Sequence, residues 1–270
     1  VDIPEERDEE AAVTVNEPIG YINLITNPEA MLFVKHADLD RIVLLVSRRD
    51  STHLHYYQVD FSLRGSTAST AAIPYECKLL GKQNLAPHSN TWVAFSPAGL
   101  ALSPHDPGLL AVATSSLPHM KVIIVRLLFP PAERFDGNDA QPEQQPAEPE
   151  TQATQALAAL TLQNREDSAI LVQANTFAPQ TAYSTPQIVW RPDGSGVWVN
   201  GDDGVVRGIE TKTGKIVATL THGHDVGCKV RTIWAGWVEA LRDEGKVDIE
   251  EWVVSGGFDK RLIVWKNDQS

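Results

Sequence analysis

The sequence contains few cysteines and no long apolar run. Only Cys77 and Cys228 occur in 270 residues, and they form neither a CxxC pair nor a metal-ligand spacing. Two isolated cysteines do not make a disulfide framework, so a reducing intracellular compartment, cytoplasmic or nuclear, is expected. The longest apolar stretch, residues 121–130, is interrupted by Arg126 and is shorter than the roughly 18–20 residues that span a bilayer. No membrane association is therefore predicted.

Motifs of catalysis and of phosphate binding are also missing. The sequence has no glycine-rich phosphate loop and no GxSxG motif. His36, His53 and His55 lack a third ligand at a matching spacing, and Asp202-Asp203 fits a β-turn better than a calcium loop. We therefore expect no cofactor and no metal, and the protein is not predicted to be an enzyme.

The charge balance narrows the class of partner. The formal net charge is −12, which disfavours binding to nucleic acid. An acidic surface accommodates a basic protein or peptide, although it also serves solubility alone. Residues 1–12 are predicted to be an acidic, disordered lead-in unlike a signal peptide. Because the first residue is Val1, the numbering could begin inside a longer gene product.

Most of the remaining chain consists of short β-type runs separated by turns. The most compact stretch predicts strands within residues 186–194, 196–200, 205–210 and 215–220, with Gly-rich turns between them. Three other stretches repeat this order with less regularity. Their predicted strands fall at residues 31–34, 41–46, 53–59 and 75–80, then at 91–99, 108–114, 121–125 and 169–173, and finally at 230–236, 251–255 and 261–265.

Two segments break this rhythm. Residues 131–167 are predicted to be an insertion, disordered and rich in Pro, Gln and Glu up to Glu150, with a short helix over 151–163. The insertion is interpreted as a tolerated surface loop or as a partner-binding segment that orders on contact. A charged stretch, residues 239–246, is predicted to interrupt the last unit.

Four strands with tight turns, repeated at about 40 residues in the least decorated unit, predict an all-β propeller. The blades are expected in residues 13–130 and 168–270. Stacked blades cover both faces of each small sheet, which explains strands that are nearly continuous in Val, Ile and Leu.

The last unit resembles a WD40 repeat. Residues 253–266, Val-Val-Ser-Gly-Gly-Phe-Asp-Lys-Arg-Leu-Ile-Val-Trp-Lys, are similar to the end of such a repeat, and Gly223-His224-Asp225 resembles its opening Gly-His. Residues 95–99 and 190–194 resemble the FSPDG turn of the family. The resemblance covers residues 29–266 and is strongest over 185–266.

The resemblance implies a structural network and an incomplete ring. In the family, a His, a Ser or Thr, an Asp and a Trp are linked by hydrogen bonds, which here correspond to His224, Ser255, Asp259 and Trp265. The other units depart from this pattern, the first most of all. About four blades are visible, whereas a closed WD40 ring has about seven. The missing part is expected from an absent segment or from another chain, and a strand at residues 11–15 could close the last blade.

WD40-like propellers bind proteins through loops at one end of their blades, so the resemblance implies a non-catalytic interaction scaffold within a multiprotein complex. One alternative is a reader of basic peptides such as histone tails, and a second is a propeller enzyme with a central metal. By family geometry, the partner-binding candidates on the top face are Arg48, Arg49, Trp190, Asp202, Arg231, Trp234, Phe258 and Lys260.

Overall fold

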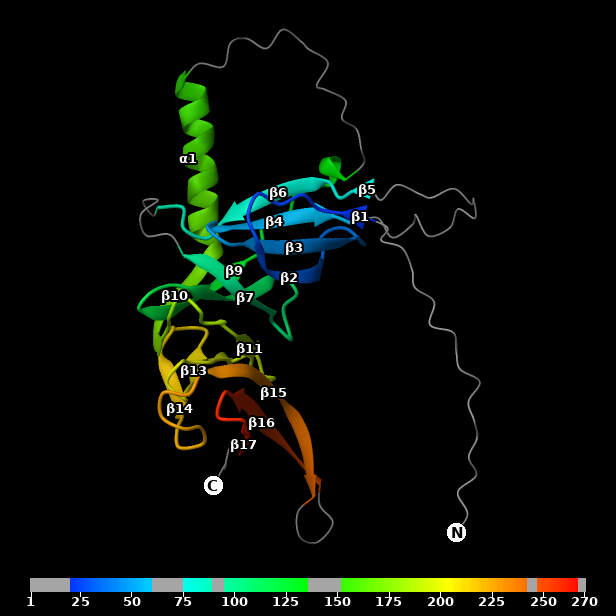
Figure 1. Cartoon of the computed structure of the whole chain (residues 1–270). Coiled ribbons are helices and arrows are strands. Elements are labelled where there is room, and N and C mark those ends of the chain that lie inside the picture. The colour runs from blue at the N-terminus through cyan, green and yellow to red at the C-terminus, as the bar shows by residue number, and fades with distance from the viewer. Residues whose placement is uncertain (1–19, 60–74, 89–94, 136–151, 242–246, 267–270) are drawn as a thin grey trace, which may run out of the picture.

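The computed structural model describes residues 20–59, 75–88, 95–135, 152–241 and 247–266. Within them, the strands form four antiparallel sheets and one short parallel pair. Figure 1 shows the four sheets stacked along the molecule in chain order, and we call them sheets 1 to 4. The predicted lead-in and the predicted strand at residues 11–15 lie outside the described residues.

Sheet 1 has the strand order β2-β3-β4-β6, and its strands are β2 (Pro28–Lys35), β3 (Ile42–Arg48), β4 (His53–Gln58) and β6 (Leu79–Asn84). The fourth strand was expected at residues 75–80 and begins later. Tyr75–Glu76 instead form β5, which pairs in parallel with β1 (Gly20–Tyr21). This correction has a non-local cause, because the partner strand lies more than fifty residues earlier in the chain.

Sheet 2 has the order β7-β8-β9-β10, with strands β7 (Ser96–Leu102), β8 (Leu109–Ser115), β9 (His119–Arg126) and β10 (Ile170–Pro179). The FSPDG-like residues 95–99 do not form a turn here. Ser96 to Gly99 lie within β7, where the register shifts between Pro97 and Gly99 as in a β-bulge. The bulge accommodates the proline inside an extended segment.

The insertion between β9 and β10 contains a short 3-10 helix, η3 (Ala132–Arg134), and the helix α1 (Gln152–Ala169). The helix is longer than predicted, because its last turns are anchored on sheet 1. Gln163 donates to the Pro87 carbonyl at 2.7 Å, and the Asn84 N–H donates to Glu166 at 2.8 Å. Its first turns rise beyond sheet 1 (Figure 1). Most of the predicted disordered part, residues 136–150, lies outside the described residues.

Sheet 3 follows the predicted strand pattern closely, with strands β11 (Ile188–Trp190), β12 (Gly196–Val199), β13 (Val206–Glu210) and β14 (Ile216–Leu220). Its turns use glycine where the backbone requires it. Gly194 has φ +73°, and its N–H donates to the Arg191 carbonyl at 2.9 Å. Residues other than glycine rarely adopt this conformation, so the glycine in the sequence is enough to predict the turn.

Sheet 4 contains the strands β15 (Val230–Leu241), β16 (Val247–Gly257) and β17 (Leu262–Lys266). The predicted interruption at residues 239–246 is wrong in part. Glu239 to Leu241 continue β15 and pair with the start of β16, so the hairpin projects past the rest of the sheet (Figure 1). Among the described residues, no strand pairs with the outer edge of β17.

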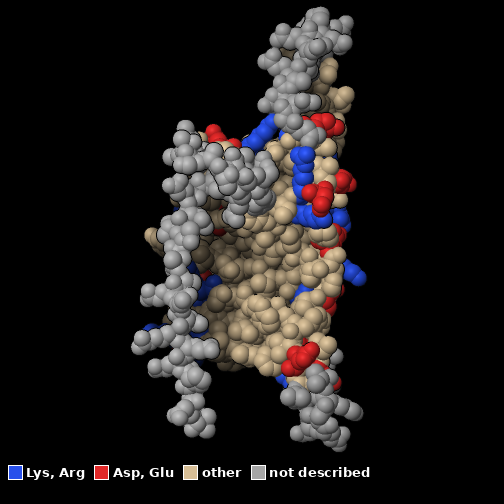
Figure 2. Space-filling view, turned by 90° about the vertical axis from the view of Figure 1, so that its right-hand side faces the viewer, with Lys and Arg blue, Asp and Glu red and all other residues tan. Residues whose placement is uncertain are grey.

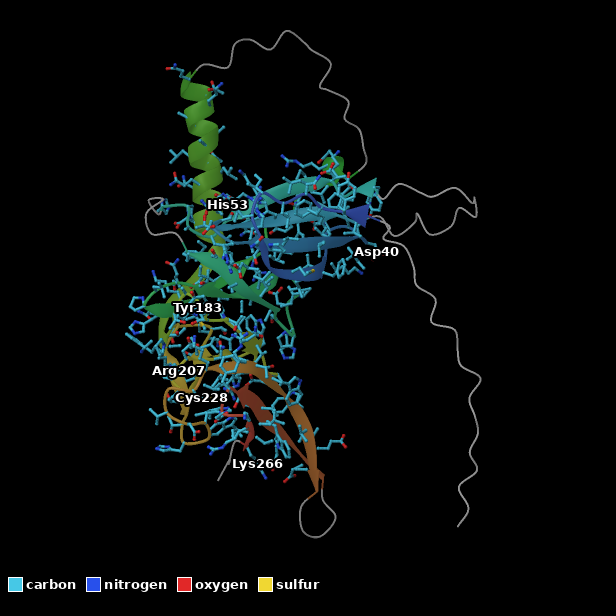
Figure 3. All side chains as sticks on the ribbon, viewed as in Figure 1. Asp40, His53, Tyr183, Arg207, Cys228 and Lys266 are labelled. Atoms are coloured by element: carbon cyan, nitrogen blue, oxygen red, sulfur yellow. The ribbon has the colours of Figure 1, made fainter. Side chains whose placement is uncertain are left out.

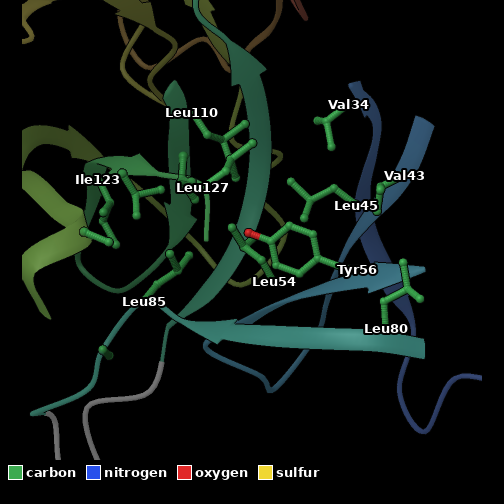
Figure 4. Close-up of a cluster of buried hydrophobic side chains, with 14 of the residues drawn as sticks. Val34, Val43, Leu45, Leu54, Tyr56, Leu80, Leu85, Leu110, Ile123 and Leu127 are labelled. Carbon is green, nitrogen blue, oxygen red and sulfur yellow. The ribbon is translucent and has the colours of Figure 1, made fainter. Parts of the chain in front are cut away.

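The core lies between successive sheets. Figure 4 shows Leu45, Leu54 and Tyr56 of sheet 1 near Leu110 and Leu127 of the sheet 2 region, all of them buried. The Tyr56 hydroxyl donates to the buried Gln83 side chain at 2.7 Å, which satisfies the polar end of the ring. Similar clusters join sheet 2 to sheet 3 and sheet 3 to sheet 4. Burial on both faces explains the apolar strands β8 and β9.

Candidate interaction site

The turns on one side of the stack form a continuous surface, which we call the loop face. It consists of the turns and connections at residues 49–52, 116–118, 180–187, 200–205, 221–229 and 258–261. Figure 3 shows Tyr183, Arg207 and Cys228 on this side, whereas Asp40, in the turn from β2 to β3, lies on the other. Adjacent sheets therefore present successive loops toward one approaching partner.

Five of the predicted partner-binding residues lie on or beside the loop face: Arg49, Asp202, Arg231, Phe258 and Lys260. Arg49 is paired with Glu29, with 2.6 Å between Nε and Oε1. Asp202 accepts hydrogen bonds from Ser184 and lies 3.2 Å from the Lys229 ammonium. The Arg231 guanidinium lies 5.1 Å from the centre of the Phe258 ring, a cation–π contact.

Three other predicted binding residues lie elsewhere. Trp190 is 6% exposed, and its indole N–H donates to the Ala101 carbonyl at 2.8 Å, so it is part of the core. Trp234 lies in β15 on the outer face of sheet 4, and Arg48 ends β3 on the outer face of sheet 1. Each lies in a strand with its side chain on a sheet face, whereas Arg231 lies near the start of β15 and reaches Phe258 in the adjoining turn.

A hollow of about 530 Å³ opens on the loop face between sheets 1, 2 and 3. Its charged residues are balanced in sign: Glu29 and Asp50 against Arg49 and Lys121. Serine and threonine hydroxyls supply much of the remaining polar lining, and Phe95 is its only aromatic residue among those described. The hollow therefore offers hydrogen-bonding groups without a net charge.

The opposite side of the stack differs in its distribution of charged side chains. Figure 2 shows that Lys, Arg, Asp and Glu lie along its margins, while the visible centre has almost none. The visible part of this side therefore presents no cluster of like charges to a partner.

The four residues of the predicted network are in contact at the loop-face end of sheet 4. His224 Nδ1 lies 3.0 and 3.1 Å from the two Asp259 carboxylate oxygens, and its Nε2 lies 2.9 Å from Ser255 Oγ. The Trp265 indole N–H donates to the same Ser255 oxygen at 2.9 Å. The network connects the loop before β15 with β16, the following turn and β17.

The acceptors determine the direction of these hydrogen bonds. A carboxylate cannot donate, so His224 Nδ1 donates to Asp259, and in that tautomer Nε2 accepts from the Ser255 hydroxyl. Burial by itself would raise the pKa of Asp259. Hydrogen bonds from the Asp225 N–H, from His224 and from the Arg261 N–H outweigh it and lower the pKa to about 2.

The Ser255–His224–Asp259 order matches the chemistry of a nucleophile, a base and an orienting acid. Ser255, however, is fully buried and already accepts the Trp265 N–H, so a substrate cannot reach its oxygen in this structure. The geometry fits a role in holding the strands of sheet 4 together.

Cys228 joins this cluster, which the sequence reasoning did not foresee. The ligand atoms of His224, Cys228 and Asp259 lie within 4.8 Å of one another, a set that could hold a metal ion. Each atom already has a hydrogen-bond partner, since Cys228 Sγ accepts the Asp259 N–H at 3.3 Å. A Cβ on Gly257 would lie 2.8 Å from all three, so any residue larger than glycine would crowd these atoms. In this structure the three side chains are engaged in hydrogen bonds with one another and with the backbone.

The three histidines weighed as ligands in the sequence do not gather at one site. His36 is buried at the opposite end of sheet 1, where its Nε2 lies 2.9 Å from the Pro130 carbonyl. His53 and His55 are neighbours on β4, with ring centres 6.3 Å apart. His55 contacts Arg48 rather than a carboxylate or thiol.

The outer face of sheet 4 carries a second feature that the sequence reasoning missed. Trp234, Leu262 and Val264 point to the same face and are 48%, 69% and 52% exposed. Val254 lies between Trp234 and Val264 in the register, and Trp252 follows on the same face between Gly236 and Lys266. The alternation of side chains in β15 to β17 places apolar residues on both faces of the sheet. This pattern was the sequence signal that could have predicted the apolar outer face.

Four antiparallel sheets packed face to face in chain order define the propeller class of all-β proteins. A family described as a beta-propeller domain matches residues 4–265. The chain therefore belongs to this beta-propeller family. No curated protein matches the chain. In the described part of the chain, no helix combines the length and the apolar character needed to cross a bilayer.

Proposed function

We propose that the protein is a non-catalytic interaction scaffold of the WD40 type, working within a multiprotein complex. The observation that carries this proposal is the outer face of sheet 4. Contiguous exposed apolar surface is uncommon on soluble monomers and marks places where another protein binds. Here, exposed Trp234 on β15 and exposed Leu262 and Val264 on β17 lie on either side of Val254 on the central strand β16.

The occupant that fits this face is another β-sheet of the same kind. Between sheets 1 to 4, each inward face is composed of the same Val, Ile, Leu and Trp side chains. The other end of the stack is also apolar, with Met31 and Ile42 exposed on sheet 1. Further blades, from another segment or another chain, would cover these two faces and complete a ring. We infer that the ring has about seven blades.

The hydrogen-bonded network supports the WD40 assignment within the propeller class. Its four side chains occur at the positions that the resemblance implies, and all four are linked in sheet 4. The corresponding position in sheet 3 holds Asp203, which pairs with Arg207 at 2.6 Å instead of with a histidine. One complete and one altered network agree with a WD40 array in which the repeats have diverged.

The insertion offers a second contact with a partner. The first turns of α1 present exposed Leu157, Leu160 and Leu162, and residues 152–162 contain no charged side chain. An isolated helix of this length is marginal in water, so contact with a partner would stabilise it. The hydrogen bonds of Gln163 and Glu166 hold the helix at its other end.

The balanced charge of the loop-face hollow gives no specific support to the alternative of a basic-peptide reader. Such a reader uses carboxylates with aromatic side chains around the bound cation. In the described lining, Arg49 neutralises Glu29, and Phe95 is buried.

Quantitative affinity purification with mass spectrometry tests the proposal. The first variant, Trp234→Glu/Val264→Glu, alters the outer face of sheet 4 and is called the end-face variant. It is compared with a loop-face variant, Tyr183→Glu/Phe258→Glu, because Tyr183 and Phe258 are also exposed. We expect the end-face variant to lose the subunits that complete the ring, while the loop-face variant loses a different set of proteins.

Circular dichroism on both variants establishes that the fold is kept. Retention of every partner by both variants, or recovery of no specific partner by the unaltered protein, would overturn the scaffold function. Losses confined to the loop-face variant would overturn the role of the sheet 4 face.

A further inference from the structure

Three side chains of the types that bind transition metals converge at the loop-face end of sheet 4. His224 and Cys228 belong to the loop before β15, and Asp259 lies in the turn between β16 and β17. Their ligand atoms, an imidazole nitrogen, a thiol sulfur and a carboxylate oxygen, all lie within 4.8 Å of one another. Three residues separate His224 from Cys228, a spacing by which zinc sites take two ligands from one short segment.

A glycine provides the space toward which these ligand atoms are directed. A Cβ built on Gly257 would lie 2.8 Å from all three of them, so the three atoms surround a common point. Because residue 257 is glycine, no side chain occupies that point. An ion displaced from it toward the three atoms would reach the distances of about 2.0–2.3 Å that Zn²⁺ forms with nitrogen, oxygen and sulfur.

The charge of the cluster also favours a cation. The side chain of Asp259 is only 2% exposed, and its carboxylate accepts the N–H groups of Asp225 and Arg261. Among the described residues, no Lys or Arg side chain forms an ion pair with this carboxylate. One Zn²⁺ bound to a thiolate and a carboxylate gives a site without net charge, which lowers the cost of excluding water from it.

The existing hydrogen bonds would orient the ligands. The ion replaces the direct bond between His224 Nδ1 and Asp259, so the imidazole proton moves to Nε2 and is donated to Ser255 Oγ, 2.9 Å away. The Ser255 oxygen has a second lone pair, which accepts the Trp265 N–H. The Asp259 N–H donates to Cys228 Sγ at 3.3 Å, and a thiolate accepts this bond more strongly than a thiol.

We propose that His224 Nδ1, Cys228 Sγ and an Asp259 carboxylate oxygen bind Zn²⁺. The mixed nitrogen, sulfur and oxygen ligands suit this ion, whereas Ca²⁺ and Mg²⁺ require oxygen ligands. Binding releases the thiol proton to water, and a water molecule takes the fourth tetrahedral position. Residues 225–227, in the turn between the two loop ligands, are exposed, so the ion reaches the site from the loop face.

The bound ion would join the loop before β15 to the turn that precedes β17. It would therefore strengthen a sheet in which, among the described strands, nothing pairs with the outer edge of β17. The site does not involve the outer face of sheet 4, and it goes beyond the scaffold function without depending on it.

A titration of the tag-free whole chain with Co²⁺ tests the site, because Co²⁺ replaces Zn²⁺ and makes the ligands visible by absorption. We expect one equivalent of Co²⁺ to produce a thiolate-to-cobalt charge-transfer band together with the visible bands of tetrahedral Co²⁺. One equivalent of Zn²⁺ should then abolish both. Failure of the charge-transfer band to appear with Co²⁺ in several-fold excess would overturn the proposal.

The two cysteines provide a matched pair of variants. Cys228→Ser should remove the charge-transfer band and weaken Zn²⁺ binding, measured by competition with a chromophoric chelator, at least about tenfold, because even groups behind the ligands contribute that much. Cys77→Ser, at the other half-buried cysteine, should leave the band and the affinity unchanged. Metal binding that Cys228→Ser leaves unchanged would show adventitious binding to other side chains and would overturn the site.

The unaltered protein gives a test that does not require any variant to fold. Both cysteines are free thiols, so alkylation of each can be followed by peptide mass spectrometry with and without Zn²⁺. Zn²⁺ should slow alkylation of Cys228 at least about tenfold, in proportion to the occupied fraction of the site, and leave the rate at Cys77 unchanged. Equal rates at Cys228 in the two conditions would overturn the proposal.

Discussion

Replacing Ser255 with alanine isolates the contribution of the hydrogen-bonded network to stability. The Ser255 hydroxyl donates to His224 Nε2 and accepts the Trp265 N–H, both at 2.9 Å, and the residue is fully buried. Alanine leaves two polar atoms without partners and opens almost no cavity. At roughly 1–3 kcal/mol for each unsatisfied buried group, the variant should lose about 2–6 kcal/mol of its free energy of unfolding.

Urea unfolding followed by tryptophan fluorescence measures this loss. With a slope of about 2 kcal/mol per molar urea, the midpoint should fall by roughly 1–3 M. Ser168→Ala is the matched control, because the Ser168 hydroxyl on exposed α1 bonds only to the carbonyl of Asn164 at 2.8 Å. Its effect should stay within about 0.5 kcal/mol.

A double variant gives a sharper test of the same reasoning. Ser255→Ala combined with Trp265→Phe removes both the acceptor and the indole N–H that needed it. The double variant should therefore be less destabilised than the sum of the two single variants. Strict additivity, or a loss below about 0.5 kcal/mol for Ser255→Ala alone, would refute the network as a stabilising element.

Three further predictions concern neighbouring parts of the fold. Trp190→Ala empties a core position, so urea unfolding should show a loss of about 3–5 kcal/mol in the free energy of unfolding. Phe258 is exposed, and Phe258→Ala should lower the same free energy by less than about 0.5 kcal/mol. Similar losses for the two variants would contradict their different burial. Asp259→Asn should flatten the acid unfolding curve. The pKa of Asp259 in the folded protein is about 2, below the ordinary 3.8, so the ionised carboxylate stabilises the fold above about pH 4. This stabilisation is lost as the pH falls toward 2. An acid unfolding curve that Asp259→Asn leaves unchanged would contradict the prediction. Gly223→Ala would place a Cβ 2.4 Å from the Trp265 ring. The free energy of unfolding should therefore fall by about 1–3 kcal/mol, and the tryptophan emission should shift. Wild-type stability and emission would disprove the close contact.

The local features of the fold were accessible from the sequence. Residues 186–220 contain their strands, turns and glycines in the order found, because turn chemistry and period-2 alternation act over only a few residues. The resemblance also named the four network residues, and their hydrogen bonds join them in sheet 4.

Other elements were not accessible in this way. The pairing of Tyr75–Glu76 with Gly20–Tyr21 depends on chain segments that meet only after sheet 1 has formed. Trp190 and Trp234 have similar apolar neighbours in sequence, yet one is buried and the other is half exposed. The difference arises because sheet 2 covers Trp190, while no described element covers the face that holds Trp234.

By itself, the sequence determined that the chain forms short antiparallel sheets, where most of them begin and end, and which residues tie the last one together. These properties follow from alternation, turn residues and short-range hydrogen bonds. The tertiary structure alone decided which sheet faces are covered, that Cys228 joins the network, and that Ile22 and Ile25 lie at the same hollow as Arg48 and His55. Coverage is a non-local property, because it depends on which sheet or segment packs against a face and not on the residues of that face.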